Sequence, residues 1–418
     1  MSLTNDASVE RKLVGYDNFK RSNPKSDKFE ILCFHHVEFY CSDSTNVSRR
    51  FSCALGMPIV AISNLSTGNS KYSSIVLQSN SLCFVFTAPY GVSFSKGREE
   101  ISPPPHPGFD VEQAHDFVRG KFSNIIKIFL FWLLQSFTSY FQILRVDHGL
   151  AVRAIAIRVA DASEAYRIST ENGAVGVLQP TKLLDKVSGE MMDISEIRMF
   201  GDVVIRWVSG TFLGPMLPNY QPTNTSHLGS KSSSTFGILR LDHSVSNVPK
   251  LFEAVDYLAA ATGMHEFAEF ASADIGTLDS GLNSMVLGNN NEMVLLPINE
   301  PTFGTKRQSQ IQTYLDHNNG AGLQHLALLS EDIFETVRQM KIRGDPHSLA
   351  GGGAGFEFMP APSADYYSRA VQRIGENVLS TSQWKDLQDL GILADKDDQV
   401  CLLCCSYYCI NVVNLPAP

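Results

Sequence analysis

The sequence has little that would direct the chain to nucleic acid, to a membrane surface or to an oxidising compartment. Its 34 Lys and Arg residues are outnumbered by 43 Asp and Glu residues, so the formal net charge is −9. A general affinity for nucleic acid or anionic lipid is therefore not expected. Only 8 of the 418 residues are cysteine, which excludes a disulfide scaffold. Residues 1–29 are polar and mixed in charge, unlike a secretory signal. We expect a cytoplasmic protein with reduced thiols.

The composition is that of a globular protein, with 44% apolar and 18% charged residues. A chain of this length is expected to form two or more domains. Two histidine-containing strands support this division, FHHVEFY (34–40) and LDHSVSN (241–247). Each is followed at the same spacing by a Gly-Met pair, at 56–57 and 263–264, so the offset is 207 in both cases.

A second repeated pair of segments follows the first. GLAVRAIAIRVADA (149–162) and GLQHLALLSEDI (322–333) alternate like half-buried strands and continue into helical patterns. Here Ala154 aligns with His325, an offset of 171. The sequence therefore predicts two halves, each built from two strand-helix-strand modules. The first half has 36 extra residues between its modules, because 207 − 171 = 36.

Segment 120–146 accounts for most of these extra residues. It is rich in Phe, Ile and Leu, and it has no acidic residue. Polar side chains interrupt it, so no uninterrupted apolar run reaches the roughly 18 residues of a membrane span. A membrane helix and a buried helix are both alternatives, but a foreign insertion fits the spacing of the repeats best. We expect no association with a membrane.

Two histidines of the second half predict a metal site. His243 and His325 each lie in an apolar strand that begins a module, whereas the first half has His36 but Ala154 at the second position. A single histidine on such a strand is usually a hydrogen-bonded core residue. Two at symmetry-related positions favour metal binding. Simple strand alternation places Asp242 on the opposite face from His243.

Four polar residues accompany this histidine pair in the second half: Ser284, Asn299, Gln310 and Gln324. Buried amides and hydroxyls can orient a small polar substrate beside a metal ion. Hydrogen bonding at turns or at the surface is an equally acceptable interpretation from the sequence alone.

A redox iron site commonly uses two histidines and one carboxylate. The carboxylate should come from the last strand of the fourth module, by analogy with EIRMF (196–200) and DVVIRWV (202–208) in the first half. After Gln399 only VCLLCCSYYCINVVNLPAP follows, with room for one strand and no Asp or Glu. We therefore expect the third ligand to be missing. The four cysteines of this tail could form a zinc cluster, but they have no second ligand pair at a distance.

Long stretches of the chain resemble the plant-type 4-hydroxyphenylpyruvate dioxygenases of the vicinal-oxygen-chelate superfamily. They include RLDHSVSNVP, FAEFASADIGTLDSGLNSMVL and NEMVLLPINEPTFGTKRQSQIQTYLDHNNGAGLQHLALLSEDIF. The likeness covers roughly residues 29–119 and 147–399. It implies an α+β fold in which paired βαβββ modules form two open barrels.

The resemblance also implies an activity and a set of site residues. Family members convert 4-hydroxyphenylpyruvate and O2 to homogentisate and CO2 with Fe(II), in tyrosine and phenylalanine catabolism, and their product feeds plastoquinone and tocopherol synthesis. His243 and His325 correspond to iron ligands. The substrate would be bound by Ser284, Pro297, Asn299, Gln310 and Gln324. A homodimer is expected by the same resemblance.

The resemblance divides the chain into four parts. Residues 1–28 are expected to be a flexible segment, and 29–212 a two-module barrel domain containing the insert 120–146. Residues 213–235 form a Ser/Thr-rich linker, and 236–418 a metal-binding domain truncated after 399.

Compared with the family, the glutamate ligand and a C-terminal helix are missing, and segment 120–146 is additional. Two translated introns in a faulty gene model would explain both departures. We expect the chain as written to bind Fe(II) poorly and to turn over little substrate; a non-catalytic family relative is the alternative.

Overall fold

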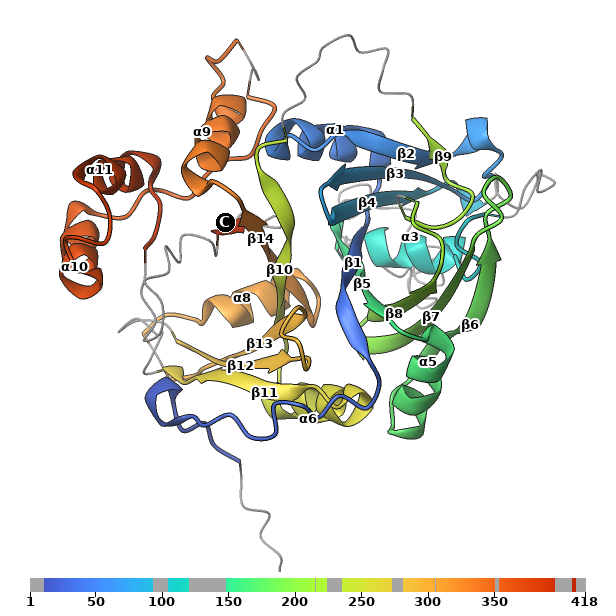
Figure 1. Cartoon of the computed structure of the whole chain (residues 1–418), viewed down its shortest axis with the longest axis horizontal. Coiled ribbons are helices and arrows are strands. Elements are labelled where there is room, and N and C mark those ends of the chain that lie inside the picture. Colours follow the sequence, from blue (N-terminus) through green and yellow to red (C-terminus); the bar gives the residue numbers. More distant parts are fainter. Residues whose placement is uncertain are drawn as a thin grey trace, which may run out of the picture.

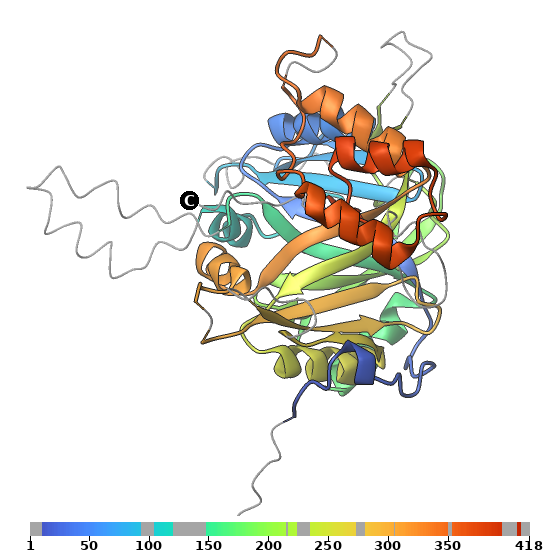
Figure 2. The same ribbon diagram turned by 90° about the vertical axis from the view of Figure 1, so that its left-hand side faces the viewer.

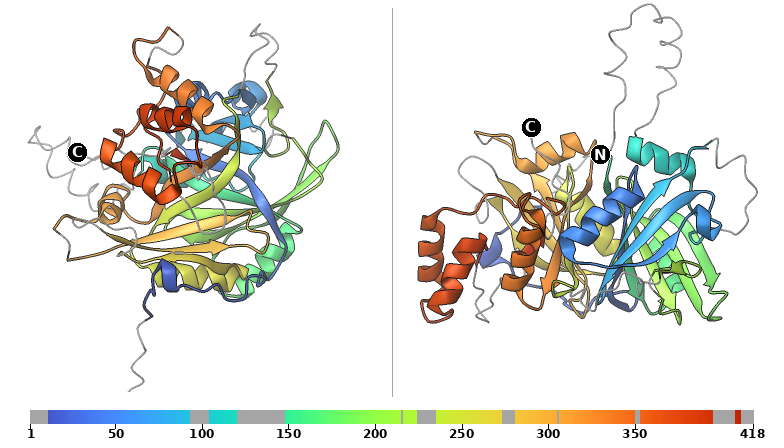
Figure 3. Two further views of the ribbon diagram at one scale, coloured as in Figure 1. Left: turned by 60° about the vertical axis from the view of Figure 1, so that its left-hand side comes forward. Right: turned by 90° about the horizontal axis from the view of Figure 1, so that it is seen from above.

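The computed structural model describes residues 11–92, 104–119, 148–214, 216–223, 235–272, 281–304, 306–349 and 353–394, and the backbone of 408–410. These residues form two twisted sheets that lie side by side, with helices around them (Figure 1; Figure 3). The insert 120–146 lies outside the described residues, as does most of the cysteine-rich tail. Among the described helices, none is long and apolar enough to cross a bilayer.

The first half of the chain forms one sheet, with the order β6-β7-β8-β5-β1-β4-β3-β2-β9 in the described residues. Its first module comprises β1 (Ile31–Tyr40), α1 (Ser44–Leu55), β2 (Ile59–Ser63), β3 (Tyr72–Ser79) and β4 (Leu82–Pro89). Helix α3 (Val111–Arg119) follows. The second module comprises β5 (Ala151–Val159), α5 (Ala162–Glu171), β6 (Gly176–Leu184), β7 (Met191–Phe200) and β8 (Val203–Gly210).

The second half forms the other sheet, with the order β11-β12-β13-β10-β14-β15 in the described residues. Its first module comprises β10 (Ile238–Asn247), α6 (Leu251–Thr262), β11 (His265–Phe270), β12 (Leu282–Gly288) and β13 (Leu295–Pro301). Helix α8 (Gln310–His317) follows. The remaining elements are β14 (Gly322–Ser330), α9 (Ile333–Gly344), α10 (Ala364–Ile374), α11 (Thr381–Leu390) and β15 (Tyr408–Ile410). Helices α10 and α11 pack with α9 in a separate apolar cluster (Figure 2).

The repeat found in the sequence is confirmed. The elements β1 and α1 begin 207 residues before β10 and α6, and β5 and α5 begin 171 residues before β14 and α9. The pairing repeats as well, since β1 is parallel to β4 and antiparallel to β5, as β10 is to β13 and β14.

Local sequence explains where these helices begin and end. Asp43, Asp161 and Asp332 are N-caps, and each side chain accepts hydrogen bonds from the free backbone amides of the first turn. Helices α1 and α6 are followed by the C-cap residues Gly56 and Gly263, which have φ angles of 65° and 82°. A side chain would be strained in this left-handed conformation, and at Gly263 it would also meet the Ser26 carbonyl oxygen.

The two halves differ at the outer edge of their second modules. In the first half, β8 pairs in parallel with β5 over Ala154–Arg158, and β7 and β6 extend the sheet. In the second half, the strand that joins β14 at this edge within the described residues is β15, antiparallel and opposite Leu326–Leu328. The described residues thus contain no counterpart of β6 to β8 in the second half.

Residues 11–28, which the sequence predicts to be flexible, lie against β11 and α6 of the second half (Figure 1). Arg11 pairs with Asp256, and the Tyr16 ring stacks on Phe270 at 5.1 Å. Arg21 lies 3.7 Å from the centroid of the Phe267 ring. These cation–π and ring contacts hold a segment whose composition alone gives no sign of them. Likewise, two residues of the expected linker, Gln221–Pro222, form β9 beside β2.

Candidate metal and substrate site

The two histidines singled out in the sequence lie next to each other in the second half. His243 is on β10 and His325 on the adjacent antiparallel strand β14, where Val245 is the partner of His325. The centroids of the two imidazole rings are 6.1 Å apart, with an angle of 72° between the planes. Rings at this separation can direct one nitrogen each at a single metal ion.

Each imidazole is oriented by the residue that precedes it. The Nδ1 atom of His243 lies 3.0 Å from Oδ2 of Asp242, and Nδ1 of His325 lies 2.7 Å from Oε1 of Gln324. Since these oxygens only accept hydrogen bonds, the Nδ1 atoms carry the protons and the Nε2 atoms carry the lone pairs. This is the usual arrangement for a metal-binding histidine.

The contact between Asp242 and His243 corrects the expectation that the two side chains lie on opposite faces. The ladder between β10 and β14 shifts register between Leu241 and His243. A β-bulge of this kind turns consecutive side chains towards the same side. Sequence periodicity cannot reveal it.

The His325 imidazole is in its neutral form at physiological pH. Burial, and then the proximity of His243, lowers the pKa of His325 from 6.5 to about 3. Only a neutral imidazole can donate its lone pair to a metal ion. Metal binding at His325 therefore does not have to displace a proton.

A cavity of about 430 Å³ opens beside the two rings. All seven residues named from the sequence line it: His243, Ser284, Pro297, Asn299, Gln310, Gln324 and His325. They come from five different elements, β10, β12, β13, α8 and β14. The structure thus brings the whole set together, while the role of each residue remains a prediction.

The polar residues hold defined places around this cavity. Ser284 on β12 is buried and lies opposite Asn299 in the ladder with β13. The Asn299 amide donates to Oδ1 of Asn247 at 3.2 Å. Gln310 begins α8, where Ser309 caps the helix by accepting from the amide of Ile311.

Sequence reasoning missed the apolar wall of the cavity, which includes Phe267 and Phe270 of β11. Strand alternation assigns residues three apart to opposite faces. A register shift between Glu266 and Ala268 in the β11–β12 ladder brings both rings to the cavity. The only signal in the sequence is the aromatic content of HEFAEF.

The site offers two protein ligands to a metal ion. Within the parts of the chain that the structure describes, no group of three or more His, Cys, Asp or Glu residues is placed to hold a metal. The two imidazoles fit a ferrous ion in donor type and protonation state. The carboxylate that would complete a three-ligand face is not among the described residues.

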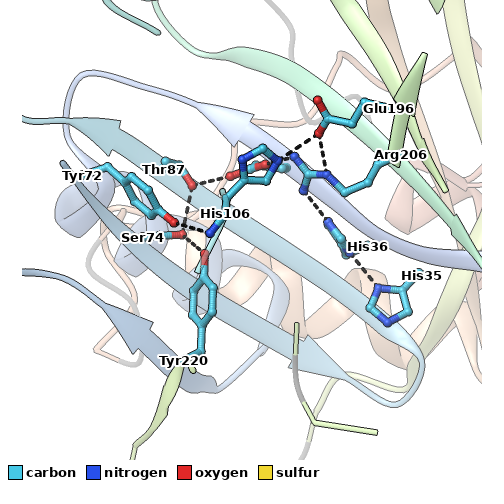
Figure 4. A network of polar contacts seen from close by, with 10 residues as sticks. His35, His36, Tyr72, Ser74, Thr87, His106, Glu196, Arg206 and Tyr220 are labelled. Carbon is cyan, nitrogen blue, oxygen red and sulfur yellow. Dashed lines mark hydrogen bonds and ion pairs between the residues drawn. The ribbon is translucent and has the colours of Figure 1, made fainter. Parts of the chain in front are cut away.

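The first half has a very different arrangement at the equivalent place (Figure 4). Arg206 on β8 donates from Nη1 to Nε2 of His36 at 2.9 Å, from Nη2 to Glu38 at 2.8 Å, and from Nε to Glu196 at 2.7 Å. His106 also contacts Glu196, at 3.0 Å. His36 is therefore an acceptor in a buried ion-pair network. The sequence signal for it was charged residues inside otherwise apolar strands.

The comparison with protein-family models found no match. Among curated proteins, the chain is 48% identical to 4-hydroxyphenylpyruvate dioxygenase from Daucus carota over 403 residues, 96% of this chain and 80% of that protein. It is 48% identical to the Arabidopsis thaliana enzyme of the same name over 94% of this chain and 80% of that protein. It is 49% identical to the one from Plectranthus scutellarioides, over 94% and 81% of the two chains.

Solved structures give the fold independently. A mutant of 4-hydroxymandelate synthase from Streptomyces coelicolor matches with a TM-score of 0.61, covering 88% of this chain and 86% of that one, at 18% identity. The predicted α+β fold of paired modules is thereby confirmed. Identity near one half over almost the entire chain settles the family: the chain belongs to the 4-hydroxyphenylpyruvate dioxygenases, of the plant type.

Proposed function

We propose that this chain acts on 4-hydroxyphenylpyruvate and O2, giving homogentisate and CO2, with a ferrous ion held by His243 and His325. The observation that carries the proposal is the convergence of two oriented imidazoles and four polar side chains on one cavity. The reaction would belong to tyrosine and phenylalanine catabolism and supply plastoquinone and tocopherol synthesis. When bound, Fe(II) supplies the activation of O2 and the redox chemistry.

The protein's own contribution is to bind and orient the substrate and to exclude water. We assign Ser284, Asn299, Gln310 and Gln324 to the polar groups of the substrate, because amides and hydroxyls form directional hydrogen bonds. Pro297, with the phenylalanines of β11, forms an apolar wall against the aromatic ring. An apolar wall also keeps bulk water from the reacting keto acid.

A metal held by two neutral ligands is held weakly. A carboxylate would add a third bond and an opposite charge, and none of the described residues supplies one. We therefore propose that a chain of this sequence binds Fe(II) poorly and turns over little substrate. The same observation favours a second candidate function, that of a non-catalytic family relative that binds the keto acid without converting it.

Two measurements on the same protein separate these functions. Anaerobic titration with Fe(II) reports metal affinity, and chromatography of homogentisate after exposure to O2 reports turnover. Slow homogentisate formation that His325→Ala abolishes supports the catalytic proposal. Saturable binding of 4-hydroxyphenylpyruvate with no homogentisate supports the non-catalytic relative. Tight iron binding and rapid turnover would contradict the weak-site proposal.

We also propose a cytoplasmic location and a homodimer. The location is supported by four free thiols among the described residues, Cys33, Cys41, Cys53 and Cys83, which suit a reducing compartment. The homodimer rests on the family resemblance. Fractionation of cells and light scattering of the purified protein test these two proposals, and a membrane-bound or monomeric protein would overturn them.

A further inference from the structure

The barrel of the first half has a cavity of its own, remote in sequence from the one that contains His243. It measures about 590 Å³ and lies between α3 and the strands β5, β6, β7 and β8. This volume is within the range of small-molecule sites. Its lining is rich in charged groups, and three of them set it apart: Arg153, Asp116 and His106.

Arg153 brings a cation to the β5 side of the cavity. Its side chain is half-buried, and no other described residue gives it a hydrogen bond or an ion pair. Its nearest ring contact is Tyr40, whose centroid lies 6.0 Å from the guanidinium carbon. A guanidinium presents parallel N–H donors that match a carboxylate in two simultaneous hydrogen bonds.

Asp116 brings an anion to the α3 side. Of the other carboxylates in the lining, Glu196 is paired with Arg206, Asp202 is paired with His148, and Asp110 accepts from a first-turn amide of α3. Asp116 has no such partner among the described residues. The cavity thus presents one available carboxylate, Asp116, and two available guanidiniums, the half-buried one of Arg153 and the exposed one of Arg198.

His106 adds a buried acceptor. The residue is 5% exposed, and its Nε2 faces the Glu196 carboxylate at 3.0 Å, so Nε2 carries the proton. In the neutral ring, Nδ1 is then an acceptor, and it has no hydrogen-bond partner among the described residues. A buried polar atom without a partner is costly. A ligand with an N–H donor would satisfy it.

We propose that this cavity binds an α-amino acid with an apolar or aromatic side chain. The α-carboxylate pairs with Arg153, the α-ammonium donates to Asp116 and to Nδ1 of His106, and the side chain lies against Phe117 and Leu178. A ligand with a single charge would leave either Arg153 or Asp116 without a partner. The proposal is independent of the reaction in the second half.

Titration calorimetry of the full chain with L-phenylalanine tests the proposal. We expect saturable binding of one molecule per chain. Two analogues test the two charged contacts separately: 3-phenylpropionate lacks the ammonium group and phenethylamine lacks the carboxylate. Each is expected to bind at least about tenfold more weakly, because each loses one charge-assisted contact. No saturable binding up to about 10 mM L-phenylalanine, or equal affinity for an analogue, overturns the proposal.

Variants place the ligand in this cavity. Arg153→Gln and Asp116→Asn should each weaken binding by at least about tenfold, and circular dichroism checks that both still fold. Glu112→Gln is the matched control, because it is exposed on the same helix α3 and does not line the cavity. If His325→Ala abolishes binding while Arg153→Gln and Asp116→Asn do not, the amino acid binds in the second half and the proposal is wrong.

Discussion

The two barrels use a repeated scaffold for opposite purposes. His36 and His243 occupy equivalent positions on β1 and β10, 207 residues apart. In the first barrel Nε2 of His36 accepts a hydrogen bond from the buried guanidinium of Arg206. In the second barrel His243 lies beside His325, and a cavity opens in front of both rings. The first barrel holds a cation of its own chain, the Arg206 guanidinium, whereas the second barrel is suited to a metal ion taken up from solution.

The difference follows from a few side chains. At the position of His325 the first barrel has Ala154, and it adds Glu38 and Glu196 as partners of Arg206. Burial alone would raise the pKa of the Glu196 carboxyl, but Arg206, His106 and Arg153 together outweigh burial and hold this pKa well below its usual range. The first barrel is therefore fixed in a charged, internally paired state. One scaffold thus supports a closed structural network and an open site.

Among these predictions, removing the Arg206 guanidinium should have the largest effect, a loss in the free energy of unfolding. Arg206→Met takes the guanidinium away from two buried carboxylates, and losing one member of a buried ion pair typically costs about 3 to 5 kcal/mol. Urea unfolding measures the loss. Arg167→Met, on the exposed face of α5, is the control and should change stability little. A loss as small as that of the control would show that the network does not stabilise the first barrel.

Replacing a histidine of the second barrel should lower metal affinity, whereas replacing the equivalent histidine of the first barrel should not. His243→Ala and His325→Ala should each lower the affinity for Co(II), used as a spectroscopic probe, by more than about tenfold, because even partners that only orient a ligand contribute this much. His36→Ala should leave Co(II) affinity unchanged while lowering the unfolding temperature. Equal loss of Co(II) binding in all three variants would erase the distinction between the barrels.

Replacing Asp242, the hydrogen-bond acceptor beside His243, should have a smaller effect on Co(II) affinity. Asp242→Ala removes the carboxylate that faces Nδ1, so the ring loses its orientation, and Co(II) affinity should fall by about tenfold. Glu253→Ala, an exposed change on α6, is the matched control. Unchanged affinity in Asp242→Ala would mean that the barrel, rather than Asp242, orients the ring.

The smallest effect concerns pH. Because the pKa of His325 is lowered to about 3, the unfolded chain binds a proton that the folded chain does not bind between about pH 6.5 and pH 3. The free energy of unfolding therefore falls as the pH falls through this window. His35, with a pKa lowered to about 4 by burial and then by Arg158, contributes to the same loss. In the metal-free protein, His325→Gln should make the free energy of unfolding fall less steeply with falling pH. His317→Gln, an exposed change on α8, should leave the slope unchanged. Parallel curves for wild type and His325→Gln would contradict this.

The sequence determined the repeat, the modules, the two histidines and their polar neighbours, because these depend on residue spacing and on alternation along single strands. The offsets of 207 and 171 place whole strands and helices in the structure. The seven site residues are far apart in the chain, yet they line one cavity.

Tertiary structure decided the rest. The bulge that brings Asp242 to His243, and the one that turns Phe267 and Phe270 to the same cavity, depend on pairing between strands. The hydrogen bonds of Arg206 join residues up to 170 positions apart. The cavity with Arg153 and Asp116 is lined by residues of α3 and of the strands β5 to β8, which are distant in the chain. Contacts between distant segments carry no periodic signal, because each is set by how the elements pack and not by the residues next to it.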